Sequence, residues 1–219
     1  MLPGVGTGDP RVGADLRSVP WSAVGRLQLP GLSRCTAVMI APHWAVTAAH
    51  CLGAKRLGHV APPSAVHLLM GYADGAFVRH IVADRVYVDR DAANDPNVHR
   101  GRDFALLQFA EAATDFLVLD AGALVPGAAL QLGGYGQDRA ERLAVDPACT
   151  LRGYQADGDG NPLLIHDCNG TRGTSGGAVI RHVDGVWHLV GVAVAGNVQG
   201  AGGVAVPAMT VARALAALR

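Results

Sequence analysis

The sequence predicts an all-β protein with one helix at its C-terminus. Short segments rich in Val, Leu, Ile and aromatic residues recur along the chain, and clusters of Gly, Pro, Asn or Asp separate them. Strands spaced this regularly are typical of a β-sandwich or β-barrel rather than of alternating strands and helices. The segment AMTVARALAALR (208–219) is the exception, because its Ala and Leu residues favour a helix.

Each half of the chain contains several segments that are expected to form strands. In the first half they are residues 25–29, 35–41, 44–49, 65–71, 78–88 and 104–109. In the second half they are residues 128–136, 148–155, 162–168, 176–180, 186–195 and 202–208.

Two polar segments are predicted to be irregular. Residues 89–103 contain Pro96 and are expected to form a loop. Residues 157–162 (DGDGNP) place acids at alternate positions, as a calcium-binding loop does, but Pro162 stands where such a loop needs glycine. A hairpin tip without a metal ion is therefore the preferred interpretation.

Composition excludes several classes of function. The chain has 219 residues, is 50% hydrophobic and 16% charged, and carries no net charge. A basic surface for nucleic acid is not expected. No apolar run is long enough to span a bilayer, and the first residues lack the basic-then-apolar pattern of a signal peptide.

The four cysteines favour two local disulfides. Cys35 and Cys51 are 16 residues apart, Cys149 and Cys168 are 19 apart, and no C-x-x-C spacing suggests a zinc site. Disulfides form in oxidising compartments, so we expect a secreted or periplasmic protein whose leader is not part of this chain. The alternative is four reduced cysteines in the core of a cytosolic protein.

Two polar residues stand where a catalytic base and its partner would be held. His50 follows two small alanines and precedes Cys51, so a disulfide there would help to keep the imidazole in one orientation. Asp103 comes directly before the apolar segment 104–109, and a partly buried carboxylate needs a donor such as an imidazole N–H. The alternative for Asp103 is a solvated turn residue.

Glycines surround a single serine in the segment CNGTRGTSGGAV (168–179). Ser175 needs a base to act as a nucleophile, and His50 is the candidate. The N–H groups of Gly173 and Ser175 are candidates for an oxyanion hole, where each donor contributes roughly 3–4 kcal/mol to transition-state stabilisation. Along the chain the order is His, Asp, Ser, which differs from the orders in subtilisins and α/β-hydrolases.

The motifs VTAAHC, RDFALL and GTSGGAV together resemble the trypsin-like serine protease family, from about Val19 to the C-terminal helix. The resemblance implies two six-stranded antiparallel Greek-key β-barrels packed together, with the active site between them. It implies an N-terminal extension (1–18), a first barrel (19–118) with His50 and Asp103, and a second barrel with the C-terminal helix (119–219) that carries Ser175.

The resemblance is closest to bacterial members, including those similar to glutamyl endopeptidases. Thr174 replaces the Asp that animal digestive members pair with a new N-terminus, so activation by that ion pair is not expected. Ala193 stands where glutamate-specific members carry a histidine, and Gly170 where they use Thr. By position, the residues expected to bind substrate are Asn169 at the base of the pocket and Gly170, Arg172, Val194, Ala195, Gly196 and Gly203 around it.

These observations predict a secreted serine endopeptidase that acts through an acyl-enzyme on proteins or peptides. We expect a monomer without cofactor, metal ion or nucleic-acid partner. Two alternatives remain: a catalytically silent binding module on the same scaffold, and a serine esterase.

Overall fold

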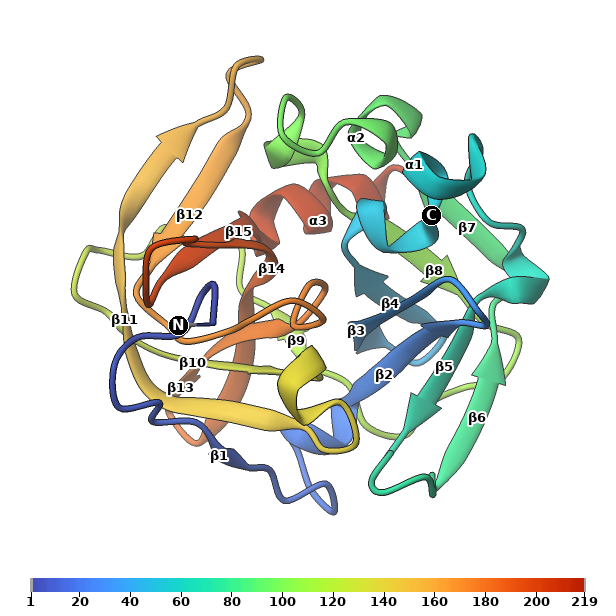
Figure 1. Cartoon of the computed structure of the whole chain (residues 1–219), viewed down its shortest axis with the longest axis horizontal. Coiled ribbons are helices and arrows are strands. Elements are labelled where there is room, and N and C mark those ends of the chain that lie inside the picture. The colour runs from blue at the N-terminus through green and yellow to red at the C-terminus, as the bar shows by residue number, and fades with distance from the viewer. Residues whose placement is uncertain (1, 219) are drawn as a thin grey trace.

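Two curled antiparallel β-sheets form the molecule, and a computed structural model describes residues 2–218 (Figure 1). The strands are β1 (Val12–Gly13), β2 (Val24–Leu29), β3 (Ser33–Ala41), β4 (Trp44–Thr47), β5 (His67–Met70), β6 (Arg79–Val82), β7 (Arg85–Val88), β8 (Ala105–Gln108), β9 (Val118–Leu119), β10 (Ala129–Gly134), β11 (Ala144–Ala156), β12 (Pro162–His166), β13 (Ala178–Val183), β14 (Val186–Gly196) and β15 (Gly203–Pro207). The α-helices are α1 (Ala54–Leu57), α2 (Arg90–Asn94) and α3 (Ala208–Ala216). Single turns of 3₁₀-helix are η1 (Trp21–Ala23), η2 (Ala49–Leu52), η3 (Pro63–Ala65), η4 (Arg100–Arg102) and η5 (Gln137–Arg139).

The first sheet contains seven strands in the order β6-β5-β2-β3-β4-β8-β7. Its centre is the meander β2-β3-β4, whose residues are almost all buried. The single strand predicted over residues 78–88 is wrong, because the chain leaves β5 and joins β8 at this point. Ala83 N–H donates to Val66 and Asp84 N–H donates to Gln108, which separates β6 from β7.

The second sheet closes into a barrel. Six strands follow one another in the order β11-β10-β13-β14-β15-β12, and the pairing of β11 with β12 completes the ring. Two short strands join from outside this ring: β1 pairs with β11, and β9 pairs in parallel with β14. The segment before residue 19 therefore lies against the second sheet.

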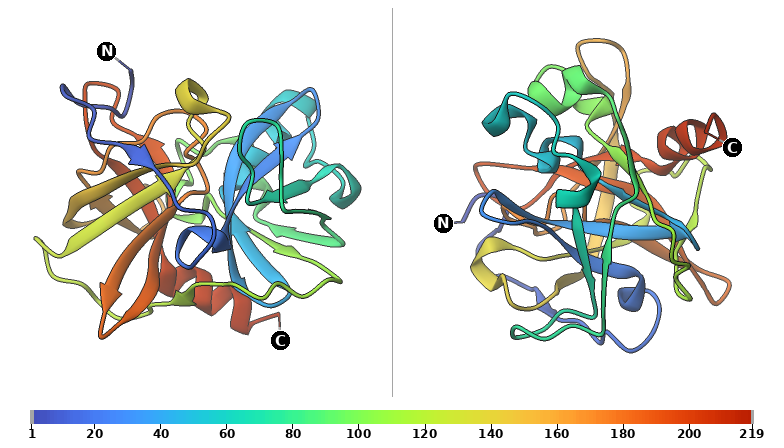
Figure 2. Two further views of the ribbon diagram at one scale, coloured as in Figure 1. Left: turned by 90° about the horizontal axis from the view of Figure 1, so that it is seen from below. Right: turned by 90° about the vertical axis from the view of Figure 1, so that its right-hand side faces the viewer.

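The predicted all-β class with a C-terminal helix is confirmed, and the structure refines the two barrels. The second sheet is a closed six-stranded barrel, whereas the first is a curled seven-stranded sheet whose end strands β6 and β7 do not pair with each other. Helix α3 packs through Ala208, Val211 and Leu215, which recur at helical spacing and are buried. Figure 2 shows α3 running along the base of both sheets.

The predicted loop 89–103 contains more structure than its polar composition suggested. Asp89 accepts hydrogen bonds from the N–H groups of Asp91 and Ala92 and so caps the N-terminus of α2. Further along the segment, η4 ends immediately before Asp103. The segment is therefore held by local hydrogen bonds where a loop was expected.

A hydrophobic core extends across both sheets, beside a smaller cluster that lies within the closed barrel. The larger core includes Met39 and Leu106 from the first sheet and Ile180 and Val192 from the second. The loops at the top of this interface are also bonded across it, since Thr36 N–H on β3 donates to the carbonyl of Ser175 at 2.8 Å. The two sheets therefore meet as one packed body at the position of the candidate site.

Both predicted disulfides are formed. Cys35 bonds to Cys51 and links β3 to η2, and Cys149 bonds to Cys168 and links β11 to the segment after β12. No helix within residues 2–218 has the length and apolar character needed to span a membrane.

Candidate active site

His50 lies in η2, directly after the buried strand β4. The two alanines before it are fully buried, and the Cys35–Cys51 disulfide attaches the next residue to β3. Gly53 then ends the turn with a left-handed conformation and donates its N–H to the carbonyl of His50. These constraints hold the backbone of His50 while 28% of its side chain stays exposed.

Asp103 uses both of its carboxylate oxygens on His50. Oδ1 accepts the backbone N–H of His50 at 2.9 Å, and Oδ2 lies 2.7 Å from Nδ1 of the imidazole. The Asp103 side chain is only 1% exposed. Because an ionised carboxylate only accepts hydrogen bonds, Nδ1 must be the protonated nitrogen, which leaves Nε2 free to accept a proton.

The loop that carries Ser175 is bonded to both sheets. The carbonyl of Ser175 accepts from Thr36 on β3, and Gly176 N–H donates to Ala193 on β14 at 2.7 Å. Gly176 has φ +80°, and a Cβ at this position would lie 2.0 Å from the carbonyl oxygen of Thr36. The glycine after the serine therefore permits the close approach of the two sheets. Ser175 and His50 line one cavity of about 290 Å³.

The peptide groups before Ser175 turn two N–H donors away from other protein partners. The carbonyl of Arg172, on the peptide that carries Gly173 N–H, accepts from Gln137 N–H at 2.6 Å, and the carbonyl of Thr174, on the peptide that carries Ser175 N–H, accepts from Gly177 N–H at 2.7 Å. In a trans peptide the N–H points opposite to the carbonyl, so Gly173 N–H points away from Gln137. Neither Gly173 N–H nor Ser175 N–H has a partner among the residues that the structure describes.

Gly173 also has a backbone shape that suits only glycine. Its φ is +93°, and a Cβ would lie 2.5 Å from the carbonyl oxygen of Tyr135. The two free amides and the serine hydroxyl therefore belong to one short, conformationally restricted segment. Such an arrangement can accept the negative oxygen of a tetrahedral intermediate.

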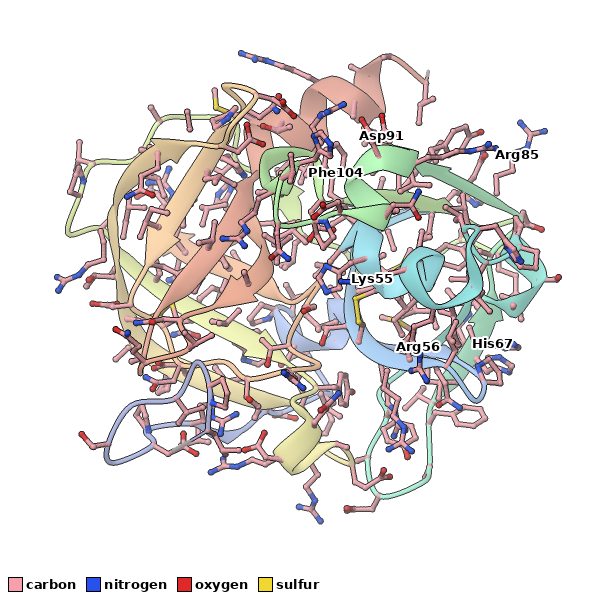
Figure 3. The ribbon with its side chains drawn as sticks, turned by 45° about the horizontal axis from the view of Figure 1, so that its top comes forward. Lys55, Arg56, His67, Arg85, Asp91 and Phe104 are labelled. Atoms are coloured by element: carbon pink, nitrogen blue, oxygen red, sulfur yellow. A yellow bond between two sulfur atoms is a disulfide. The ribbon has the colours of Figure 1, made fainter. Side chains whose placement is uncertain are left out.

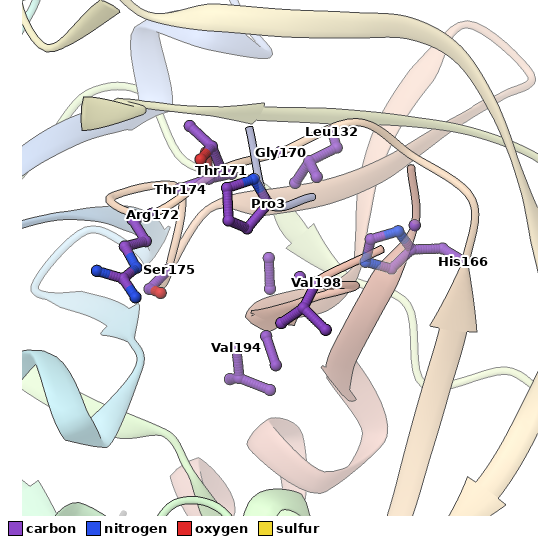
Figure 4. Close-up of a pocket in the computed structure, with 14 residues that line it drawn as sticks. Pro3, Leu132, His166, Gly170, Thr171, Arg172, Thr174, Ser175, Val194 and Val198 are labelled. Atoms are coloured by element: carbon purple, nitrogen blue, oxygen red, sulfur yellow. The ribbon is translucent and has the colours of Figure 1, made fainter. Parts of the chain in front are cut away.

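A second cavity, of about 240 Å³, is lined by Ser175 but not by His50 (Figure 4). Of the expected substrate-binding residues, Gly170, Arg172, Val194, Ala195 and Gly196 line it.

Asn169 and Gly203 do not line this cavity. The Asn169 side chain faces the interior instead: its Nδ2 donates to the buried Asp146 at 2.7 Å, and its Oδ1 accepts from Gly6 N–H at 2.8 Å. Gly203 lies behind the imidazole of His166, where an added Cβ would be 3.1 Å from the ring. The base of the cavity therefore differs from the arrangement expected by position.

His166 is a cavity residue that the sequence analysis missed. It lies across the cavity from Ser175 in Figure 4 and is only 3% exposed. Its Nδ1 accepts from Cys168 N–H at 3.2 Å, and its Nε2 has no partner among the described residues. Burial lowers the pKa of His166 to about 4, so the ring is neutral near pH 7. The alternation of β12 puts His166 on the same face as the buried Leu164, a signal available in the sequence.

The N-terminal segment forms another wall that was not anticipated. Pro3 lines the cavity, Gly4 N–H donates to Asn197, and Gly170 N–H donates to the carbonyl of Gly4 at 2.9 Å. These contacts join a segment 166 residues distant in sequence to the loop before Ser175.

Two groups of side chains in the described part of the chain have the proximity of metal ligands. They are Cys35, His50 and Cys51, and Cys149, Asp167 and Cys168. Each group contains both cysteines of one disulfide, which leaves no thiolate to bind a metal ion.

A β-protein made of a closed barrel and a curled sheet, with an imidazole–carboxylate pair and a serine where the two meet, has the layout of chymotrypsin-type peptidases. A family model described as a trypsin-like peptidase domain matches residues 35–192. This match covers more than half of the sequence, so the chain belongs to the trypsin-like peptidase family.

Solved structures support the same fold. A Glu endopeptidase in complex with MPD matches with a TM-score of 0.78 over 97% of this chain and 98% of that chain, at 20% sequence identity. No curated protein matches this sequence.

Proposed function

We propose that this chain is a serine endopeptidase in which Ser175 is the nucleophile, His50 the general base and Asp103 the residue that orients His50. The observation that carries this proposal is the double contact of Asp103 with the backbone and Nδ1 of His50. It supports the proposal because it leaves Nε2 unprotonated in the cavity that Ser175 also lines. Membership of a peptidase family points to proteins or peptides as substrates.

The reaction follows from the geometry. His50 Nε2 takes the proton of Ser175 as its Oγ attacks the scissile carbonyl, and the N–H groups of Gly173 and Ser175 receive the oxyanion. The C–N bond then breaks, and His50 returns the proton to the leaving amine, which gives an acyl-enzyme. Water attacks the ester with His50 again as base, so that the acid product leaves and Ser175 regains its proton.

We further propose that the protein works outside the cytoplasm, in the medium or the periplasm. Its two disulfides support this location because thiols stay reduced in the cytosol. We retain the proposed division into an extension (1–18), a first unit (19–118) and a second unit (119–219).

Labelling with a fluorophosphonate tests the mechanism. The folded wild type is expected to react, with the label on Ser175 by peptide mapping, whereas Ser175→Ala and His50→Ala are expected to remain unlabelled. Ser64→Ala, at an exposed serine in η3, is the matched control and should label like the wild type. Absence of labelling in the folded wild type would exclude a serine hydrolase.

Digestion of a peptide library separates a peptidase from an esterase. Cleavage of internal peptide bonds that is lost in Ser175→Ala is the expected result. Hydrolysis of activated esters without any peptide cleavage would contradict the endopeptidase.

A further inference from the structure

The two cavities that meet at Ser175 have different chemical roles under the proposed function. During acylation the leaving amine must receive a proton from His50, so the residues after the scissile bond lie on the His50 side. The cavity of about 290 Å³ contains His50, and the cavity of about 240 Å³ does not. We call the first the leaving-group cavity; its lining includes His50, Ser175 and the cationic residues Arg34, Lys55, Arg56 and Arg172.

The leaving-group cavity has a one-sided charge. None of its lining residues is acidic. Four of them are cationic and exposed: Arg34, Lys55, Arg56 and Arg172. Figure 3 shows Lys55 and Arg56 near a disulfide, and the Cys35–Cys51 disulfide lines the same cavity as these two side chains. Cations that surround one concave surface without acids attract anionic groups.

These cations are largely unpaired within the protein. Within residues 2–218, none of the four forms an ion pair with an acidic side chain. Arg56 donates to the carbonyl of Leu32, which leaves its charge uncompensated. Arg34 acts only weakly on the charge of Glu141, an acid that contacts Tyr72 and Arg26 instead. The Tyr72 hydrogen bond is the main cause of the lowered pKa of Glu141, and Arg34 contributes least.

The cavity of about 240 Å³ differs from the leaving-group cavity in the charge of its lining. It is lined mainly by Pro, Val, Ala and Gly, contains the neutral imidazole of His166, and shares only Arg172 with the cationic set. Of the two cavities, the leaving-group cavity therefore carries most of the unpaired positive charge.

We propose that the leaving-group cavity binds a carboxylate of the substrate, located within the first residues after the scissile bond. This inference rests on the proposed endopeptidase and adds a preference on the leaving side. An Asp or Glu side chain and the terminal carboxylate of a short peptide share this chemistry. Arg34, Lys55 and Arg56 are the specificity-determining residues, with Arg172 at the boundary between the two cavities.

Paired peptides test this proposal. Their acyl half is taken from a sequence that the enzyme cuts in the library, and the second residue after the bond is Glu, Gln or Lys, with the C-terminus amidated. We expect kcat/KM to be roughly three- to ten-fold higher for Glu than for Gln, because exposed charge pairs are individually weak. The Lys peptide should be the slowest. A Gln peptide with a free C-terminus placed two residues after the bond tests the terminal carboxylate as the source.

Salt and variants then test the origin of the preference. The Glu-to-Gln ratio should fall towards one at about 1 M NaCl, where the screening length is about 3 Å. The double variant Arg34→Gln/Lys55→Gln should lower the same ratio at low salt. Arg85→Gln is the matched control and should keep the ratio, because this exposed arginine on β7 does not line the cavity and lies apart from Lys55 and Arg56 in Figure 3.

The experiments distinguish failure of the proposed function from failure of the carboxylate site. If neither labelling nor peptide cleavage occurs, the proposed function is wrong. If cleavage occurs with equal kcat/KM for the amidated Glu and Gln peptides at low salt, and the free C-terminus of the Gln peptide gives no increase over its amide, the endopeptidase stands and the carboxylate site is overturned.

Discussion

At the residue scale, the buried carboxylate of Asp103 orients the imidazole of His50. Burial of an unpaired carboxylate is costly, and both oxygens of this one are satisfied by His50. The same two bonds select the tautomer in which Nε2 is the free base. Stability of the loop and orientation of the imidazole therefore depend on one pair of contacts.

Asp103→Asn is predicted to reduce kcat roughly 10³–10⁴-fold with little change in fold. The amide can donate to Nδ1, which would leave the proton on Nε2 and remove the base. Peptide hydrolysis and circular dichroism measure the two effects. Asp74→Asn, at an exposed surface aspartate that pairs with Arg142, is the control. A kcat within ten-fold of wild type would argue against the assigned role.

His166 predicts a dependence of stability on pH. Burial lowers its pKa from 6.5 to about 4. Between these two pH values the unfolded chain binds a proton at His166, whereas the folded protein keeps the ring neutral. The contribution is complete above the unfolded pKa and is lost as the pH falls through this window. It amounts to on the order of 3 kcal/mol of the free energy of unfolding.

Denaturant unfolding between about pH 7 and about pH 4 measures this effect. The wild type should lose stability steeply, and His166→Gln should show a shallower slope. His182→Gln, at an exposed histidine on β13, should follow the wild type. Equal slopes for His166→Gln and wild type would contradict the assignment.

At the scale of elements, the tip of the β11–β12 hairpin supports the segment that carries Asp103. Asp157 Oδ2 accepts Gly101 N–H at 2.8 Å, and Asp159 contacts both His99 and Arg102. Hydrogen bonds from Arg102 and His99 hold the pKa of Asp159 below its usual value, with His99 the largest contribution. The side chains of Arg102 and His99 therefore lie where a bound cation would lie beside this acidic turn.

Asp157→Ala is predicted to lower kcat several-fold, because η4 directly precedes Asp103 and small displacements of catalytic groups slow a reaction. The exposed hairpin tip contributes little to the core, so the melting temperature should change little. Steady-state kinetics and thermal unfolding give both values. Glu111→Ala removes a surface ion pair with Arg79 and serves as the control. Loss of stability in proportion to loss of kcat would indicate a structural role alone.

At the scale of the whole molecule, the larger hydrophobic core is shared by the two sheets, and the site lies where they meet. Core residues from β3 and β8 are continuous with those from β13 and β14. Such a core predicts one cooperative unfolding transition for both sheets. The Cys149–Cys168 disulfide closes a loop within the closed barrel beside the Ser175 loop.

Cys149→Ala/Cys168→Ala is predicted to lower the free energy of unfolding by about 3 kcal/mol, because the unfolded chain gains entropy. The melting temperature should fall by roughly 5–10 °C while one transition persists. Calorimetry under oxidising conditions measures both, and the wild type treated with a reductant is the parallel sample. Two separate transitions in the wild type would show that the sheets unfold independently.

The sequence by itself determined the strand-rich class, most strand positions, the C-terminal helix and the pairing of near cysteines. Each of these depends on neighbouring residues, through period-two alternation or short loop closure, so the local pattern carries them. Two segments depart from the prediction. Residues 78–88 form two strands because the chain changes its partner from β5 to β8 within them, and Asp89 caps a helix within an expected loop.

Only the tertiary structure decided which polar groups meet. It brings His50 to Asp103, turns Asn169 towards Asp146, places His166 and Pro3 in the cavity beside Ser175, and gathers Arg34, Lys55 and Arg172 around one opening. These groups come from segments separated by tens to more than a hundred residues. Their approach depends on how two sheets pack and how buried donors and acceptors are satisfied, which no local pattern encodes.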